Sequence, residues 1–228
     1  MASGPALGES GMKAARFWEP QGDGRAHCTL CPHDCTFGPG ATGTCRTRRN
    51  DRGSLISLVY GRPAAVNVDP IEKKPLFHFL PGTEVLSIGT VGCNLACRFC
   101  QNWDLSRRSP GDDSTPALAP ASILDLARSH DCPSVAFTYN EPTLQAEFVA
   151  DVAALARPAG LRIVMVTNGY VSRSALPVVY ENVDAANVDL KAFSDEFYRT
   201  VAKGHLAPVL DTLVELVRAG SGSRSPPC

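Results

Sequence analysis

The sequence predicts an α/β fold in which a parallel sheet follows a small cysteine-rich N-terminal lobe. From residue 83 onward, apolar runs typical of strands alternate with helical stretches, and a repeated strand–helix order produces a parallel sheet. Before that point, four cysteines fall within residues 28–45, among glycines and prolines that favour turns. A chain of 228 residues with 44% apolar composition is long enough to bury a core.

Charge and composition favour a globular protein that acts on small molecules or on other proteins. The 22 basic and 23 acidic residues nearly cancel, so no net field attracts nucleic acid or an anionic membrane. No apolar run is long enough to span a membrane, and the N-terminal stretch lacks the apolar centre of a signal peptide. We therefore expect a cytoplasmic protein, with neither membrane nor nucleic acid among its partners.

We divide the chain into four segments: a disordered leader, the cysteine-rich lobe, a strand–helix domain and a tail, over residues 1–14, 15–82, 83–219 and 220–228. The leader is rich in small and polar residues, and the tail has no apolar period. Within the lobe, the stretch "GSLISLVYGRPAAVNVD" alternates like a short β-hairpin.

The lobe contains the first of two cysteine clusters. The nine cysteines of the chain are clustered rather than scattered, which favours metal thiolates over disulfides. Four thiolates can close a coordination shell, which favours a structural zinc; an auxiliary iron-sulfur cluster and free thiols are the alternatives. The four ligands would be Cys28, Cys31, Cys35 and Cys45.

The strand–helix domain is predicted from four apolar runs and the helical stretches between them. The strands are expected in "EVLSIGT", "SVAFTYN", "RIVMVTNG" and "AANVDL", and the helices near residues 121–130, 143–157, 172–180 and 207–219. Each strand ends in a polar cluster: a cysteine loop, "TYNEP", "TNGY" and "DLK". Since parallel strands place their carboxyl ends at one edge of the sheet, we expect these clusters to form one pocket.

The cysteine loop follows the first of these strands and contains Cys93, Cys97 and Cys100. Gly92 lets the backbone turn tightly, so that the three thiolates can point at one centre. Three ligands on a four-iron cluster leave one iron open to a small molecule. A structural zinc, or a cluster that only carries electrons, would require a fourth ligand nearby; reduced core thiols or half of a zinc site are the alternatives.

These residues carry a family resemblance. The run "CNLACRFC" resembles the CxxxCxxC signature of radical S-adenosylmethionine (SAM) enzymes, including the aromatic residue before the last cysteine. The wider motifs "DPIEKKPLFHFLPG", "GCNLACRFCQNWDLS", "TYNEPT", "TNGY" and "VDLKAFSDEFY" resemble the radical SAM enzymes of the AmmeMemoRadiSam system, relatives of pyruvate formate-lyase activating enzyme. The resemblance covers residues 15–217, about nine-tenths of the chain.

The resemblance implies a fold and an activity. The fold would be a partial (β/α) radical SAM barrel, here truncated to about four strands. SAM would bind the open iron of a [4Fe-4S] cluster and be cleaved reductively to a 5′-deoxyadenosyl radical, which abstracts hydrogen from a protein or small-molecule substrate. Glycyl-radical activation is one candidate reaction, and flavodoxin or ferredoxin is the kind of electron donor implied.

The resemblance also implies roles for seven residues beside the cysteines. Asn140 and Glu141 stand where the family contacts the SAM amino group, and Phe99 would form a wall near the adenine. Four further polar residues follow the third and fourth strands: Thr167, Asn168, Asp189 and Lys191. No catalytic residue is assigned.

The number of strands sets an expectation for the last strand. A strand–helix unit takes roughly 30 residues, so residues 83–219 hold about four units, whereas the related partial barrels use about six. We expect "AANVDL" to be an exposed sheet edge and the pocket to open on that flank. The alternative to an enzyme is a non-catalytic iron-sulfur or zinc protein, or an inactive truncated form, that serves redox sensing or protein contacts.

Overall fold

The computed structural model describes residues 12–111 and 117–220. Most of the predicted leader and almost all of the predicted tail lie outside the described residues. Lys13 and Ala14, which the sequence analysis placed in the leader, belong instead to the lobe: Ala14 forms a β-bridge with Ile56, and Ser57 N–H donates to Lys13 O at 3.0 Å.

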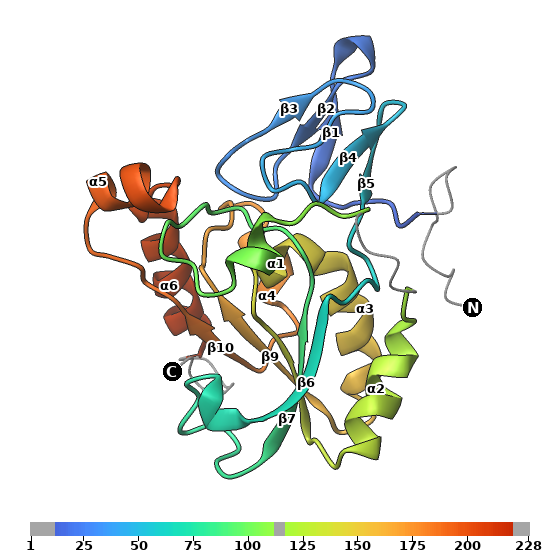
Figure 1. Cartoon of the computed structure of the whole chain (residues 1–228), viewed down its shortest axis with the longest axis vertical. Coiled ribbons are helices and arrows are strands. Elements are labelled where there is room, and N and C mark those ends of the chain that lie inside the picture. The colour runs from blue at the N-terminus through green and yellow to red at the C-terminus, as the bar shows by residue number, and fades with distance from the viewer. Residues whose placement is uncertain (1–11, 112–116, 221–228) are drawn as a thin grey trace.

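The cysteine-rich lobe consists of short antiparallel strands, at the top of Figure 1. One three-stranded sheet and one hairpin form it, with the strands β1 (Trp18–Pro20), β2 (Ala26–Cys28), β3 (Thr36–Phe37), β4 (Arg48–Asp51) and β5 (Ser54–Ser57). A 3₁₀ turn, η1 (Gly22–Gly24), joins β1 to β2. The lobe therefore has little regular structure of its own.

The main sheet has five strands in the order β10-β9-β8-β7-β6. Its strands are β6 (Ala65–Pro70), β7 (Glu84–Gly89), β8 (Ser134–Phe137), β9 (Arg162–Thr167) and β10 (Ala185–Val188). Strands β7 to β10 are parallel, which confirms the predicted α/β class and its four parallel strands.

Strand β6 corrects the predicted hairpin. The stretch over residues 53–69 does not fold on itself: its first part, β5, pairs with β4, and its last part, β6, pairs antiparallel with β7 in the main sheet. The main sheet therefore begins before residue 83, within the segment that the sequence analysis placed in the lobe.

Helices and helical turns connect the strands. They are η2 (Ile71–Lys73), α1 (Trp103–Arg107), α2 (Pro120–Ser129), η3 (Pro142–Gln145), α3 (Ala146–Ala156), α4 (Leu176–Tyr180), α5 (Asp195–Phe197), the π-helical turn η4 (Tyr198–Ala202) and α6 (Leu206–Gly220). The helices expected near 121–130, 143–157 and 207–219 are present, whereas the fourth begins later than expected, at Leu176. The cysteine loop and α1 lie between the lobe and the carboxyl ends of the parallel strands (Figure 1).

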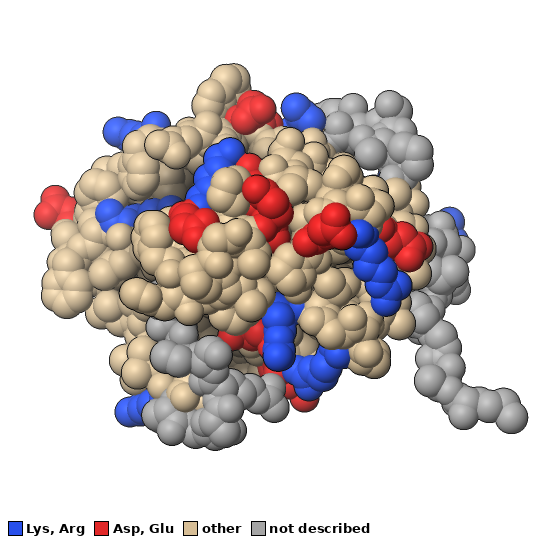
Figure 2. Space-filling model, turned by 90° about the horizontal axis from the view of Figure 1, so that it is seen from below, with Lys and Arg blue, Asp and Glu red and all other residues tan. Residues whose placement is uncertain are grey.

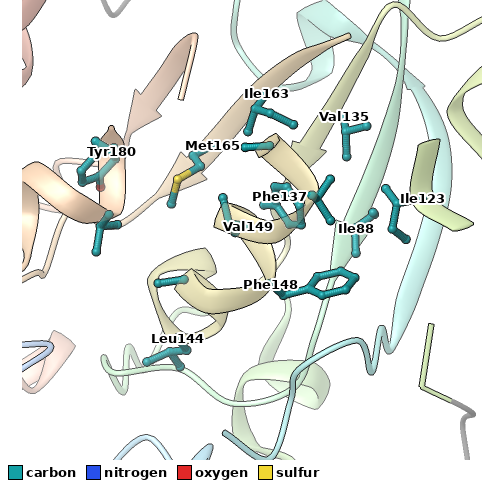
Figure 3. Close-up of a cluster of buried hydrophobic side chains, with 14 of the residues drawn as sticks. Ile88, Ile123, Val135, Phe137, Leu144, Phe148, Val149, Ile163, Met165 and Tyr180 are labelled. Carbon is teal, nitrogen blue, oxygen red and sulfur yellow. The ribbon is translucent and has the colours of Figure 1, made fainter. Parts of the chain in front are cut away.

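The two faces of the main sheet are packed differently. On one face, Ile88, Phe137 and Met165 belong to the large core that includes residues of α2, α3 and α4, as Figure 3 shows. On the other face, smaller side chains such as Val85 and Ala136 pack against Ile71 and Leu76 from the segment around η2. Because strand side chains alternate between faces, Val85 and Ala136 point to the opposite side of the sheet from Ile88 and Phe137.

Strand β10 is the sheet edge that the sequence predicted. Within the described residues it pairs with β9 alone. An apolar hollow of about 340 Å³ lies beside it, lined by residues of α4, β10 and the last turns of α6, among them Leu176, Ala185 and Leu216.

The surface carries no large field of one sign on the side that Figure 2 shows, where acidic and basic side chains are interspersed. This agrees with a formal net charge of −1. Among the described residues, no helix is long and apolar enough to cross a membrane.

Candidate active site

One cavity of about 740 Å³ lies where the parallel strands end. All ten residues predicted to surround the cofactors line it: Cys93, Cys97, Phe99, Cys100, Asn140, Glu141, Thr167, Asn168, Asp189 and Lys191. The predicted convergence of four strand-end clusters is therefore confirmed.

The cysteine loop is held in place by tight backbone contacts. Gly92 has a φ of +84°, and a Cβ atom there would lie 2.4 Å from the Thr47 side chain and 2.7 Å from Cys45 O. Glycine is therefore required both for the turn and for the close approach of the lobe. Further along the loop, Ala96 N–H donates to Ala202 O at 2.7 Å, which ties the cysteines to η4.

The three thiols are partly buried in the cavity wall. Cys93 Sγ accepts hydrogen bonds from Leu95 N–H at 3.4 Å and from Asn168 Nδ2 at 3.7 Å. Burial, and then the charge of Glu141, raises the pKa of the Cys93 thiol. Such a thiol ionises readily only beside a strong positive charge, which a bound metal would supply.

The three thiols of the loop are close enough to interact, since Cys97 and Cys100 add to the rise in the pKa of Cys93. Among residues 12–111 and 117–220, no three His, Cys, Asp or Glu side chains lie close enough together to hold a single metal ion. In a four-iron cluster each thiolate binds a different iron, so the three ligands need not share one ion. The donor set, with its soft sulfur atoms and N–H groups directed at Cys93 Sγ, fits such a cluster.

Glu141 joins the ends of β8 and β9. Its Oε1 accepts from Thr143 N–H at 2.9 Å and from Thr167 Oγ1 at 2.8 Å, and its Oε2 accepts from Asn168 N–H at 2.8 Å. Burial raises the pKa of this carboxyl, and these donors oppose the rise. Glu141 therefore fixes two neighbouring strand ends and still faces the cavity.

Asn140 supports the cysteine loop. Its Nδ2 donates to Gly92 O at 2.8 Å and to Thr90 Oγ1 at 3.0 Å, and its Oδ1 accepts from Thr90 N–H at 3.1 Å. Asn140, which was predicted to contact a cofactor, thus uses both the nitrogen and the oxygen of its amide to hold the cysteine loop. Asn168 is held in a similar way, with Nδ2 donating to Asn94 Oδ1 at 2.9 Å.

The opposite flank of the cavity carries an ion pair and an aromatic wall. Lys191 Nζ lies 2.6 Å from Asp189 Oδ2. Burial would lower the pKa of Lys191, but Asp189, Cys97 and Glu141 together raise it. Phe99 leaves half of its surface exposed and packs against Phe197, with ring centroids 5.8 Å apart.

The structure adds a group that the sequence analysis did not assign. Lys73 and Lys74, which follow β6, also line the cavity, and both bind the buried carboxylate of Asp69. Tyr139 Oη donates to the same carboxylate at 2.7 Å. The sequence does place two lysines four and five positions after Asp69. That spacing could have indicated the cluster, but it is equally typical of lysines that are exposed to solvent.

The four cysteines of the lobe line a second, separate pocket. Cys28, Cys31, Cys35 and Cys45 share this pocket with Arg48. Burial raises the pKa of Cys31 to about 12, and the other three thiols contribute to the rise, so the four sulfur atoms are close enough to interact. Arg48 is fully buried, and its Nη2 donates to both carboxylate oxygens of Glu147 in α3, at 2.8 Å to Oε1 and 3.0 Å to Oε2. This ion pair joins the pocket to the main domain.

Comparison with known proteins agrees with this architecture. The sequence model of the Radical SAM superfamily matches residues 87–225, and so extends into the segment that the sequence analysis had set outside the family. An uncharacterized protein of Methanocaldococcus jannaschii is 41% identical over 201 residues, which are 88% of this chain and 60% of that protein. A protein of the same organism, provisionally named as a glycyl-radical enzyme activating enzyme, is 24% identical over 131 residues, 58% of this chain and 49% of that protein.

The chain thus spans 60% and 49% of the lengths of these two curated relatives. Among solved structures, that of TYW1 with a lysine-pyruvate adduct bound aligns with a TM-score of 0.44 and 18% identity. It covers 67% of this chain and 61% of that chain.

Proposed function

Because the chain belongs to the Radical SAM superfamily, we propose that it cleaves SAM reductively at a [4Fe-4S] cluster, to give a 5′-deoxyadenosyl radical that abstracts hydrogen from a substrate. The superfamily implies the cluster and SAM. The observation that carries the proposal for this chain is the single cavity that holds three thiols and the polar ends of four parallel strands.

In this proposal the protein holds the cluster through Cys93, Cys97 and Cys100. The N–H groups directed at Cys93 Sγ stabilise the negative charge on that sulfur. Asn140 keeps the loop in register with the strand ends, because three of its contacts are to the backbone or side chains of residues 90–92.

SAM would lie over β8, β9 and β10. Its amino group is cationic and suits the acidic groups on this side of the cavity, Glu141 and Asp189, while Lys191 suits its carboxylate. Thr167 and Asn168 are oriented by Glu141 and supply neutral hydrogen-bonding groups. Phe99 presents an exposed aromatic face on which an adenine can stack.

The finer assignment is an activating enzyme of the AmmeMemoRadiSam type. The motifs quoted from the sequence support that family, and the provisional name of one relative supports glycyl-radical activation as the reaction. The electron would come from a donor such as flavodoxin or ferredoxin, and the protein would act in the cytoplasm on a protein or small-molecule substrate.

We also propose that Cys28, Cys31, Cys35 and Cys45 form a second metal site, which holds either an iron-sulfur cluster, whose irons take separate thiolates, or a zinc ion, around which the four thiols would have to draw closer together. Their common pocket supports this assignment. Arg48 is fully buried beside them, and its positive charge would offset part of the negative charge of a metal bound by four thiolates.

The cluster proposal is tested by electron paramagnetic resonance of the anaerobically reconstituted and reduced protein. We expect SAM to change the spectrum of the reduced cluster, because SAM would bind the iron that has no cysteine ligand. The Cys93→Ala, Cys97→Ala, Cys100→Ala variant should lose this response. Cys132→Ala, which removes a buried thiol away from the cavity, is the matched control and should keep it. A triple variant with full iron content and the same response to SAM would refute the assignment.

A further inference from the structure

Two lysines share one carboxylate in the wall of the active-site cavity. Lys73 Nζ lies 2.8 Å from Asp69 Oδ1, and Lys74 Nζ lies 2.6 Å from Asp69 Oδ2. Tyr139 completes the group, since its Oη donates to Asp69 Oδ2 and its ring centroid lies 4.8 Å from Lys74 Nζ. We call Asp69, Lys73, Lys74 and Tyr139 the Asp69 cluster.

The Asp69 cluster carries a surplus positive charge. Burial alone would raise the pKa of Asp69, but hydrogen bonds from Lys73, Lys74 and Tyr139 hold it well below its usual value, so the carboxyl is ionised at neutral pH. Burial lowers the pKa of Lys74 and the Asp69 carboxylate opposes that fall, whereas Asp69 raises the pKa of the exposed Lys73, which stays charged. The carboxylate therefore neutralises the buried Lys74 and leaves the charge of Lys73. Lys191, by contrast, has Asp189 as its own partner.

The two lysines differ in what they can bind. The Lys74 side chain is 3% exposed and is enclosed by Asp69 and the Tyr139 ring, whereas the Lys73 side chain is 66% exposed. An ammonium group has three N–H donors. Among residues 12–111 and 117–220, the Lys73 ammonium donates to Asp69 alone, which leaves two N–H donors for another molecule.

The cluster is built in position rather than mobile on the surface. Tyr139 has a φ of +71°, and its ring packs on Gly89, where an added Cβ would lie 2.9 Å from Tyr139 Cδ2. Asn102, two residues after the last cysteine of the loop, donates from Nδ2 to Tyr139 O at 2.8 Å. The cluster is therefore linked through Tyr139 to the cysteine loop.

The place of the cluster separates it from the proposed cofactor groups. Asp69 and the lysines belong to β6 and the turn after it, at one edge of the sheet, whereas Asp189 and Lys191 follow β10 at the other edge. A cofactor bound over β8, β9 and β10 leaves the β6 side of the 740 Å³ cavity for a second molecule.

We propose that the Asp69 cluster is the anion-binding end of the substrate site, so that the molecule which donates hydrogen to the radical carries a carboxylate or phosphate group bound by Lys73. That the bound molecule is the substrate of the radical rests on the proposed function, whereas the existence of the anion site does not. Lys74 and Tyr139 are positioning residues, because they act by fixing the Asp69 carboxylate against which Lys73 is held.

The anion site is tested by thermal denaturation of the full chain with two probes in separate series, inorganic phosphate and acetate, at constant ionic strength set with sodium chloride. At about tenfold excess over Kd, we expect at least one anion to raise the Tm of the native protein by about 3–6 °C. Lys73→Gln should weaken this binding about tenfold or more, because it removes a charged donor. Lys73→Arg keeps the charge and should retain the shift, as should Lys203→Gln, a matched substitution of an exposed lysine outside this cavity.

Binding of SAM to the reconstituted protein separates the two possible roles of Lys73. If Lys73 serves the substrate, Lys73→Gln should leave the Kd for SAM unchanged. A weakened Kd for SAM would overturn the inference, since the lysine would then serve the cofactor. An equal Tm shift in Lys73→Gln, or no shift with either anion in the native protein, would also overturn it. If an anion raises the Tm of the native protein but SAM leaves the electron paramagnetic resonance spectrum unchanged, the proposed function is contradicted and the anion site is not.

Discussion

Replacing Glu147 with glutamine is expected to lower the free energy of unfolding by about 3–5 kcal/mol, because it leaves the Arg48 guanidinium buried without a carboxylate. Both side chains are 1% exposed, and Arg48 Nη2 lies 2.8 and 3.0 Å from the two carboxylate oxygens. The glutamine side chain keeps the shape of the glutamate and one acceptor oxygen, but its amide N–H group would face an N–H donor of Arg48, so the loss combines the missing charge with a missing hydrogen bond. The measurement is denaturant unfolding followed by circular dichroism.

Two variants distinguish this cause from a general effect of substitution. Glu215→Gln removes one charged partner of Arg218 in an exposed pair with a similar distance, 2.8 Å, and should cost less than about 1 kcal/mol. The double variant Arg48→Met, Glu147→Leu removes both charges and should recover much of the loss. A cost below about 1 kcal/mol for Glu147→Gln would show that the pair does not hold the lobe to α3.

The largest effect on the lobe is expected from removal of the metal that we propose for it. Serine at Cys28, Cys31, Cys35 and Cys45 should abolish metal binding there and unfold the lobe, because its short strands bury too little apolar surface to fold alone. Structural zinc contributes about 10–16 kcal/mol in small zinc-binding peptides, more than such a lobe can replace. Hydrogen exchange should then become fast in β2 to β5 and stay slow in β7 to β9.

The lobe site is also tested by metal analysis of the Cys93→Ala, Cys97→Ala, Cys100→Ala variant, in which, of the two cysteine clusters, only that of the lobe could still bind a metal. We expect zinc or iron to remain in that protein, bound by the lobe, and the identity of the metal decides between the two alternatives. Absence of both metals would contradict a second site.

The sequence allowed the main sheet to be predicted because its signals are local. Each parallel strand is an apolar run bounded by turn residues, and each covering helix has its own period, so four strands and three of the four helices were found at nearly their observed positions. Strand β6 was assigned to the wrong partner because an antiparallel pairing across a loop of 13 residues, 71–83, leaves no local mark. The alternation that indicates a strand does not identify its neighbour.

The candidate site could be located from the sequence, but the direction of its side chains could not. The parallel topology alone brings the strand-end residues into one cavity. The orientation of Asn140 toward the cysteine loop depends on a partner 48 to 50 positions away, and the Arg48–Glu147 pair joins residues 99 apart. The Asp69 cluster needs Tyr139, which lies 70 positions from the aspartate and on another strand end.

The central claim is that Cys93, Cys97 and Cys100 hold a cluster at which SAM is cleaved. The most direct test is to incubate the anaerobically reconstituted, dithionite-reduced protein with SAM and to quantify 5′-deoxyadenosine and methionine by mass spectrometry. We predict that both products form in equal amounts with the native chain and with Cys132→Ala, and fall to the level of the protein-free control in the Cys93→Ala, Cys97→Ala, Cys100→Ala variant. Absence of 5′-deoxyadenosine from the iron-loaded native chain, or equal formation by the triple variant, would contradict the claim.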